Sequence, residues 1–183
     1  MLTISGLAKV LGKIPGMDLS DITETKEGWK SSLLSGRKGN DPVNLYIGKI
    51  LNGKTVLIGE SYFSDHLSVK TVQEMINSNF ISSGYPMYYI KEALGLKEVP
   101  TEIVYSLLYR SASIVLEAER LRIQNAVLII EVPEFSKSAN DYYKDFASLF
   151  CPDYQPNYFH QSQLRGRVNF YFGFFNTKLN QIH

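Results

Sequence analysis

The stretch GNDPVNLYIGKILNGKTVLIGESYF, residues 39–63, decides the fold of this chain. In its first half, residues 43–48 alternate apolar side chains with more polar or small ones, and this period of two is typical of a β-strand. The dipeptide Asn52-Gly53 favours a tight two-residue turn, because both residues tolerate a positive φ. A second apolar run over about 54–61 follows the turn. The stretch therefore predicts a β-hairpin.

Further elements are predicted on both sides of the hairpin. The segment AVLIIEV, residues 126–132, is almost wholly apolar, which is typical of a central strand covered on both faces. The remaining expected elements are helices over about 6–13, 25–35, 69–79 (capped by Ser68), 86–94, 102–122 and 139–150, and a last strand over 168–175. A hairpin followed by a helical crossover into a buried strand predicts an α/β (α+β) fold, with a mixed β-sheet whose central hairpin is flanked by helices.

Composition limits the classes of protein that need to be considered. The chain has 183 residues, 44% of them hydrophobic, and a net charge of +1, which fits a single domain over 1–183 with its core at about 25–175. The one cysteine, Cys151, excludes an intrachain disulfide framework, and we interpret it as a packing residue. The sequence has no G-x-G-x-x-G or Walker A motif, no secretory signal and no membrane-length apolar run. We therefore expect a cytoplasmic protein of a microbe with no membrane partner.

Two acids of the hairpin, Asp41 and Glu60, are candidate ligands for a divalent metal. One stands before the first strand and the other near the end of the second, so the two can converge in space. Carboxylates on rigid strands are the hard ligands that Mg²⁺ prefers, and phosphodiester hydrolysis also needs a nearby cation. Lys70 on the following helix, or Lys54, can supply that charge. The candidate catalytic set is thus Asp41, Glu60 and Lys70; the alternative is that both acids are ordinary turn and strand-end residues.

Three arginines are candidate contacts to nucleic acid. Arg110 shares one stripe of the long predicted helix with Ser113 and Glu117, while Arg165 and Arg167 belong to the basic loop HQSQLRGR. Basic residues interleaved with aromatic ones can hold a nucleic-acid strand through phosphate contacts and stacking. The alternatives are a solvated salt-bridge face on the helix and a charged loop that protects an edge strand from pairing.

Several segments together resemble an uncharacterised bacterial domain family whose core is similar to the PD-(D/E)xK, or restriction-endonuclease-like, fold. They are the segment from Gly28-Trp29 to the hairpin, YRSASIVLEAERLRIQNAVLIIEV at 109–132, SANDYYKDFASLF at 138–150 and VNFYFGFF at 168–175. The resemblance implies a nuclease-like fold without an established substrate. It also implies an Asp early in the first hairpin strand and a Glu-x-Lys-like tripeptide at the end of the second. This chain has Asn44 and Glu60-Ser61-Tyr62 at those places, so two of three active positions are altered.

Two hypotheses of function follow. The first is a nuclease-like protein with a degenerate catalytic motif, inactive and without a cofactor, that serves as a binding or assembly module, with a homo-oligomer among its forms. The 12 Tyr and 10 Phe favour it, because aromatic residues are enriched at interfaces. The alternative is an active phosphodiesterase or endonuclease that uses Mg²⁺ on DNA or RNA. Whether the chain is an enzyme depends on the chemistry that remains around Glu60.

Overall fold

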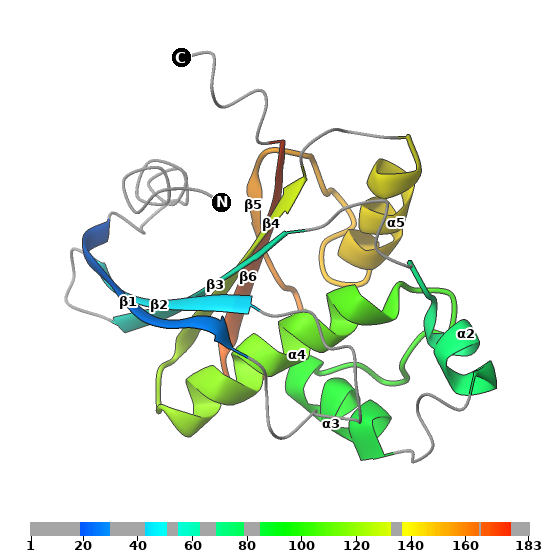
Figure 1. Cartoon of the computed structure of the whole chain (residues 1–183), viewed down its shortest axis with the longest axis horizontal. Coiled ribbons are helices and arrows are strands. Elements are labelled where there is room, and N and C mark those ends of the chain that lie inside the picture. Colours follow the sequence, from blue (N-terminus) through cyan, green and yellow to red (C-terminus); the bar gives the residue numbers. More distant parts are fainter. Residues whose placement is uncertain are drawn as a thin grey trace.

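The computed structural model describes residues 19–29, 43–50, 55–62, 69–78, 85–132, 137–164 and 166–176. These residues form six strands and four helices (Figure 1). In chain order they are β1 (Leu19–Trp29), β2 (Val43–Ile50), β3 (Thr55–Tyr62), α2 (Val72–Asn77), α3 (Tyr85–Leu94), α4 (Tyr105–Arg120), β4 (Asn125–Val132), α5 (Lys137–Ser148), β5 (Phe159–Gln161) and β6 (Asn169–Asn176).

The strands form one mixed sheet in the order β1-β2-β3-β4-β6-β5. Strands β1, β2 and β3 form an antiparallel meander, in which Ile47 of β2 lies opposite Leu57 of β3. Strands β3, β4 and β6 run parallel to one another, and β5 returns antiparallel to β6. The predicted hairpin and the predicted mixed α/β architecture are confirmed. The Asn52-Gly53 turn lies outside the described residues.

The parallel pairing of β3 with β4 requires the chain to cross from one end of the sheet to the other, and helices α2, α3 and α4 make this crossover. Figure 1 shows the helices gathered on one side of the sheet. Leu57, Leu128 and Phe172 on the sheet share one buried cluster with apolar residues of α2 to α5. This side is called the helical face below.

The opposite side of the sheet, called the second face, is also buried at the middle strands. Alternation along β3 and β4 directs Ile58 and Val127 away from the helical face, and both are fully buried. All eight residues of β4 are buried. The prediction that AVLIIEV forms a strand covered on both sides is therefore confirmed.

Aromatic side chains fill the core between α5 and β6. Tyr143 of α5 stacks on Phe174 of β6 with ring centroids 4.0 Å apart, and Phe146 and Phe150 contact Phe172 edge-on or tilted. Much of the aromatic content thus stabilises the interior. Among the helices that the structure describes, none combines the length and the apolar character needed to cross a membrane.

The predicted helix over 25–35 is wrong where it overlaps the described residues, because residues 25–29 belong to β1. The β-branched residues Ile22, Thr23 and Thr25 favour a strand, and pairing with β2 overrides a weak helical pattern. Residues 30–35 and the predicted helix over 6–13 lie outside the described residues.

The helix predicted over 69–79 is confirmed as the shorter α2, with a different cap. Thr71 accepts a hydrogen bond from the Glu74 backbone N–H, and the Glu74 carboxylate accepts one from the Thr71 N–H, which together form a capping box. The expected cap, Ser68, lies outside the described residues. The helix begins after Thr71 because the capping box gives acceptors to two backbone N–H groups, those of Thr71 and Glu74, that have no partner within the helix.

The helices predicted over 86–94, 102–122 and 139–150 are confirmed as α3, α4 and α5, with shifted ends. The last predicted strand is confirmed as β6, but β6 is not an edge strand. The loop interpretation missed β5, a three-residue strand that covers the edge of β6. A segment so short carries too little periodicity to be recognised from sequence.

Candidate functional site

The predicted catalytic acid Glu60 lies on the second face of the sheet, near the end of β3. Its side chain is only 3% exposed. The residue directly opposite on β2 is Asn44, the position at which the resemblance implies an Asp. The pairing of β2 with β3 therefore places the carboxylate residue Glu60 opposite the neutral amide residue Asn44, and both positions belong to the motif that the resemblance implies. Asp41 lies outside the described residues.

A second acid, Glu131, shares this face with Glu60. In the parallel register Glu60 pairs with Ile129, so Glu131 lies two residues farther along the neighbouring strand on the same side. It is 1% exposed. The sequence pattern of AVLIIEV predicts only a buried strand, and Glu131 is not among the residues predicted for the site. The available signal was a single acid in an otherwise apolar strand, because an acid is rarely fully buried unless it is paired.

An aromatic wall borders the two acids on the second face. Phe175 of β6 pairs with Glu131, and its ring lies 4.8 Å from that of Phe159 of β5, centroid to centroid. The rings fit because residue 173 is glycine: a Cβ at Gly173 would lie 2.8 Å from the Phe159 ring and would also clash with Phe175. The wall extends the apolar surroundings of the acids across the sheet.

Two carboxylates on adjacent strands are a partial donor set for a hard cation, which takes six or more oxygen ligands in all. Within the described segments, no group of three or more His, Cys, Asp or Glu residues is arranged to hold a metal ion. Glu60 and Glu131 alone therefore make a buried acidic pair rather than a complete metal centre.

The structure does not bring Lys70 to Glu60. Lys70 immediately precedes α2, its side chain is exposed, and its carbonyl accepts a hydrogen bond from the backbone N–H of Tyr105 at the start of α4. It therefore belongs to the layer on the helical face, whereas Glu60 points to the second face. The sheet lies between the two residues.

Arg110 lies in the interior of the helical layer. It is 1% exposed, and its stripe-mates Ser113 and Glu117 are buried too, so the expectation of a solvated face on α4 is wrong. Ser113 donates its hydroxyl to the Tyr109 carbonyl at 2.7 Å. A guanidinium in this position presents no open surface to a phosphate backbone.

Arg167 is the predicted nucleic-acid contact that lies at the surface. Its side chain is 83% exposed, and its Nη1 donates to Glu119 Oε1 at 2.6 Å. That hydrogen bond, reinforced by the charges of Glu119 and Glu92, raises the pKa of the guanidinium. Arg165 lies outside the described residues. Arg167 is thus already engaged by a carboxylate.

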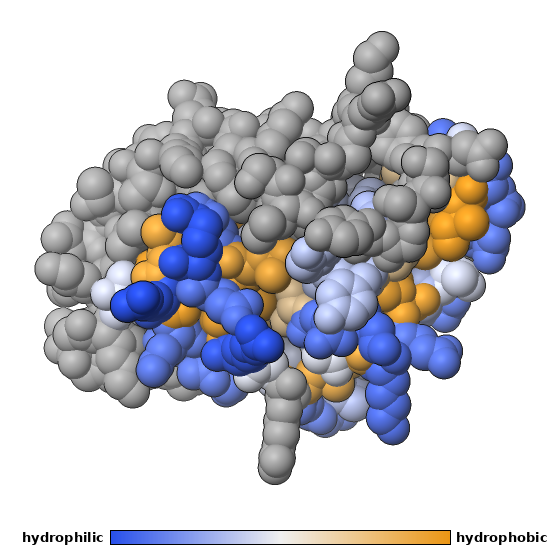
Figure 2. Space-filling model, turned by 90° about the horizontal axis from the view of Figure 1, so that it is seen from below, coloured by the Kyte–Doolittle hydropathy of each residue, from blue (hydrophilic) through white to orange (hydrophobic). Residues whose placement is uncertain are grey.

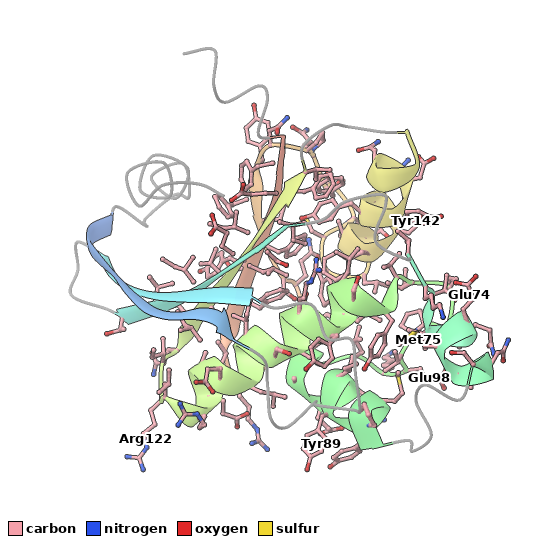
Figure 3. All side chains as sticks on the ribbon, viewed as in Figure 1. Glu74, Met75, Tyr89, Glu98, Arg122 and Tyr142 are labelled. Atoms are coloured by element: carbon pink, nitrogen blue, oxygen red, sulfur yellow. The ribbon has the colours of Figure 1, made fainter. Side chains whose placement is uncertain are left out.

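A surface pocket opens beside Arg167, between α3 and α4. It has a volume of about 210 Å³ and is lined by Tyr88, Tyr89, Glu92, Ala93, Val115, Leu116, Glu119 and Arg167. Figure 2 shows this side of the molecule, where strongly hydrophilic, pale and hydrophobic side chains alternate. In Figure 3, Tyr89 extends from α3 at this side. The pocket could not be predicted from the sequence, because its walls come from two helices and a distant loop.

The thiol of Cys151 has a polar neighbour that the packing interpretation did not foresee. Its Sγ lies 3.7 Å from His160 Nδ1, and His160 Nε2 lies 2.9 Å from the Gln155 carbonyl oxygen. Tyr154 packs edge-on against the imidazole, with ring centroids 5.4 Å apart. These contacts fix the orientation of His160 in the middle of β5, and Cys151 forms part of this local packing.

In a comparison with known families, residues 68–179 match DUF6946, a domain of unknown function. The match covers more than half of the chain. The chain belongs to the DUF6946 family. The DUF6946 region contains the whole pocket, Glu131 and Arg110, but it begins after Glu60. No curated protein and no solved structure matches the chain.

Proposed function

We propose that this DUF6946 protein is a binding or assembly module built on a restriction-endonuclease-like sheet, with a degenerate catalytic motif and no nuclease activity. The topology supports the nuclease-like part of the proposal: an antiparallel hairpin is followed by a helical crossover into a parallel strand beside it. In this proposal two positions of the catalytic motif are altered, because Asn44 stands at the position of an acid and Tyr62 at that of a lysine.

One observation supports the proposed absence of catalysis. Glu60 is buried on the second face, while Lys70, the candidate cation of the catalytic set, belongs to the layer on the helical face. Phosphodiester hydrolysis requires metal ligands and a cation that act on the same phosphate. Groups on opposite sides of a sheet cannot do so.

The experiment is a cleavage assay with single- and double-stranded DNA and RNA in Mg²⁺ and in Mn²⁺. We expect the purified chain and its Glu60→Gln variant to give the same background. Metal-dependent cleavage by the parent chain that is lost in Glu60→Gln contradicts the proposal. Glu98→Gln, which removes an exposed acid between α3 and α4, is the matched control for loss of one negative charge.

The second candidate is a Mg²⁺-dependent phosphodiesterase, with Asp41 and Glu60 as metal ligands. One specific observation favours it, namely that Glu131 lies beside Glu60 on the same face and adds a carboxylate that the motif analysis lacked. In this alternative, Glu60→Gln and Glu131→Gln both abolish cleavage. In the binding-module proposal neither variant changes the background.

A further inference from the structure

We infer that the pocket between α3 and α4 binds a basic side chain, arginine in preference to lysine, presented by a partner protein. A partner protein of this kind would be the ligand of the binding module proposed above, and only the word partner rests on that proposal. The pocket itself lies on the helical layer, away from Glu60. The pocket can bind a cation whether or not the second face has any activity.

The first evidence is an aromatic corner. Tyr88 and Tyr89 meet edge to face, with ring centroids 5.6 Å apart and an interplanar angle of 78°. Tyr88 is 58% exposed, so much of its ring is open to an incoming group. The face of an aromatic ring carries partial negative charge and attracts ammonium and guanidinium groups. Such a corner at the mouth of a pocket is suited to a cationic ligand.

The second evidence is the balance of charge in the pocket. Its walls carry two carboxylates, Glu92 and Glu119, against one guanidinium, Arg167. Glu119 is held by Arg167. Glu92 is exposed and acts on Arg167 through its charge, but it makes no hydrogen bond or salt bridge within the residues that the structure describes. One negative charge is therefore left for a ligand to neutralise.

Arginine matches both features at once. Its planar guanidinium can stack on a tyrosine ring while its fork of N–H donors faces a carboxylate. Lysine has a compact, strongly hydrated ammonium that satisfies the carboxylate but stacks less well. The apolar wall of Ala93, Val115 and Leu116 contacts the methylene stem in either case.

A nucleic-acid strand is the competing occupant, since Arg167 and the tyrosines could in principle contact a phosphate and a base. The charge balance disfavours it. A phosphate that approaches Arg167 also approaches Glu92 and Glu119, and Arg167 already shares its charge with Glu119 at 2.6 Å. Phosphate binding depends on a surplus of positive charge, which this pocket lacks.

The test uses the peptide acetyl-Gly-Arg-Gly-amide and its Lys and Gln counterparts, titrated into the whole ¹⁵N-labelled chain and followed by NMR. We expect saturable shifts of amide signals from α3 and α4, with the Arg peptide binding more tightly than the Lys peptide and the Gln peptide not saturating. Affinity should weaken with added salt, because the contact includes an exposed ion pair.

Two variants with matched controls locate the binding. We expect Glu92→Gln and Tyr88→Ala each to weaken the Arg peptide about threefold, as is usual for an exposed ion pair and a cation–π contact. Glu98→Gln removes the same charge outside the pocket; Figure 3 shows Glu98 near α2, apart from Tyr89. Tyr158→Ala removes an equally exposed ring, 60% exposed, outside the pocket. Neither control should change the affinity.

Three results overturn the inference: equal binding of the Gln and Arg peptides, equal weakening by the control variants, or saturation of the same amide signals by oligothymidylate at lower concentration than by the Arg peptide. The four substituted side chains are exposed, so retained folding is expected and is checked in the same NMR spectra. If the cleavage assay finds metal-dependent cleavage and so contradicts the proposed function, the expected results of the peptide titration stay the same. The two proposals can therefore fail independently.

Discussion

Two pairs of glutamates in this chain have opposite surroundings. Glu60 and Glu131 are buried on the second face of the sheet, on adjacent parallel strands. Glu92 and Glu119 lie at the surface pocket on the helical layer, where Glu119 binds Arg167. The same functional group thus belongs to a packed interior in one region and to an open, partly neutralised cleft in the other.

The comparison shows why residue type alone is a poor guide to a site. A buried carboxylate is costly unless its surroundings satisfy it, so Glu60 and Glu131 are tied to the fold around them. An exposed carboxylate costs the fold little and remains available to a ligand. We therefore expect changes at the buried pair to alter stability and changes at the pocket to alter binding.

The largest expected effect is on stability, from Glu60→Ala. The substitution removes a side chain from a packed interior and should lower the free energy of unfolding by about 3 kcal/mol. Glu92→Ala, at an exposed position, should change it by no more than about 0.5 kcal/mol. Urea denaturation monitored by circular dichroism measures both. Equal effects of the two substitutions would remove the distinction between the regions.

A somewhat smaller loss is expected from Gly173→Ala, on the same face as the buried acids. The added Cβ meets the rings of Phe159 and Phe175, which must shift away from their present packing. We expect a loss of about 2 kcal/mol in the free energy of unfolding. Gly166→Ala is the control, because a Cβ there finds only ordinary contacts of 3.4 Å or more. An unchanged Gly173→Ala midpoint in urea would contradict the packing described.

A pH-dependent loss of stability is expected from the ionisation of Tyr109 on α4. Burial raises the pKa of Tyr109 from 10.0 to about 12, and a hydrogen bond with Ser113 opposes this rise. Above pH 10 the unfolded chain loses the phenolic proton first, so stability is complete below pH 10 and falls as the pH rises toward 12. Unfolding free energies at pH 9 and pH 11 should differ less in Tyr109→Phe than in the parent chain. An identical difference in the parent chain and in Tyr109→Phe would show that Tyr109 is not the source of the pH dependence.

The smallest expected effect is a gain in stability from Tyr143→Phe. The Tyr143 hydroxyl is buried and has no hydrogen-bond partner among the described residues, and burial raises its pKa well above the usual value. Phenylalanine keeps the stacking on Phe174 and removes a buried, unsatisfied oxygen. We expect a gain of up to about 1 kcal/mol by thermal and urea denaturation. Tyr142→Phe, at a partly exposed neighbour, should be neutral, and a clear loss in Tyr143→Phe would mean that the hydroxyl is satisfied.

The hairpin and the β4 strand could be predicted because their patterns are local. Alternation near Val43 and the unbroken apolar run of β4 each indicate a strand without knowledge of its partners. Strand β1 could not be predicted, because its sequence is polar and its conformation depends on pairing with β2.

The candidate site was less predictable than the fold because it depends on register. The motif singled out Glu60, but the proximity of Glu131 follows only from the parallel pairing of β3 with β4. The separation of Lys70 from Glu60 likewise depends on which side of the sheet the helices cover. The pocket joins residues of α3 and α4 with Arg167, and no local pattern links such distant positions.

The most direct test of the central claim, a nuclease-like sheet without a working metal site, is a calorimetric titration of the whole chain with Mg²⁺ and with Mn²⁺. We predict no saturable heat in the millimolar range for the parent chain, and the same trace for Glu60→Gln. A saturable isotherm that disappears in both Glu60→Gln and Glu131→Gln, but persists in Glu98→Gln, would contradict the account and would establish the buried acids as metal ligands.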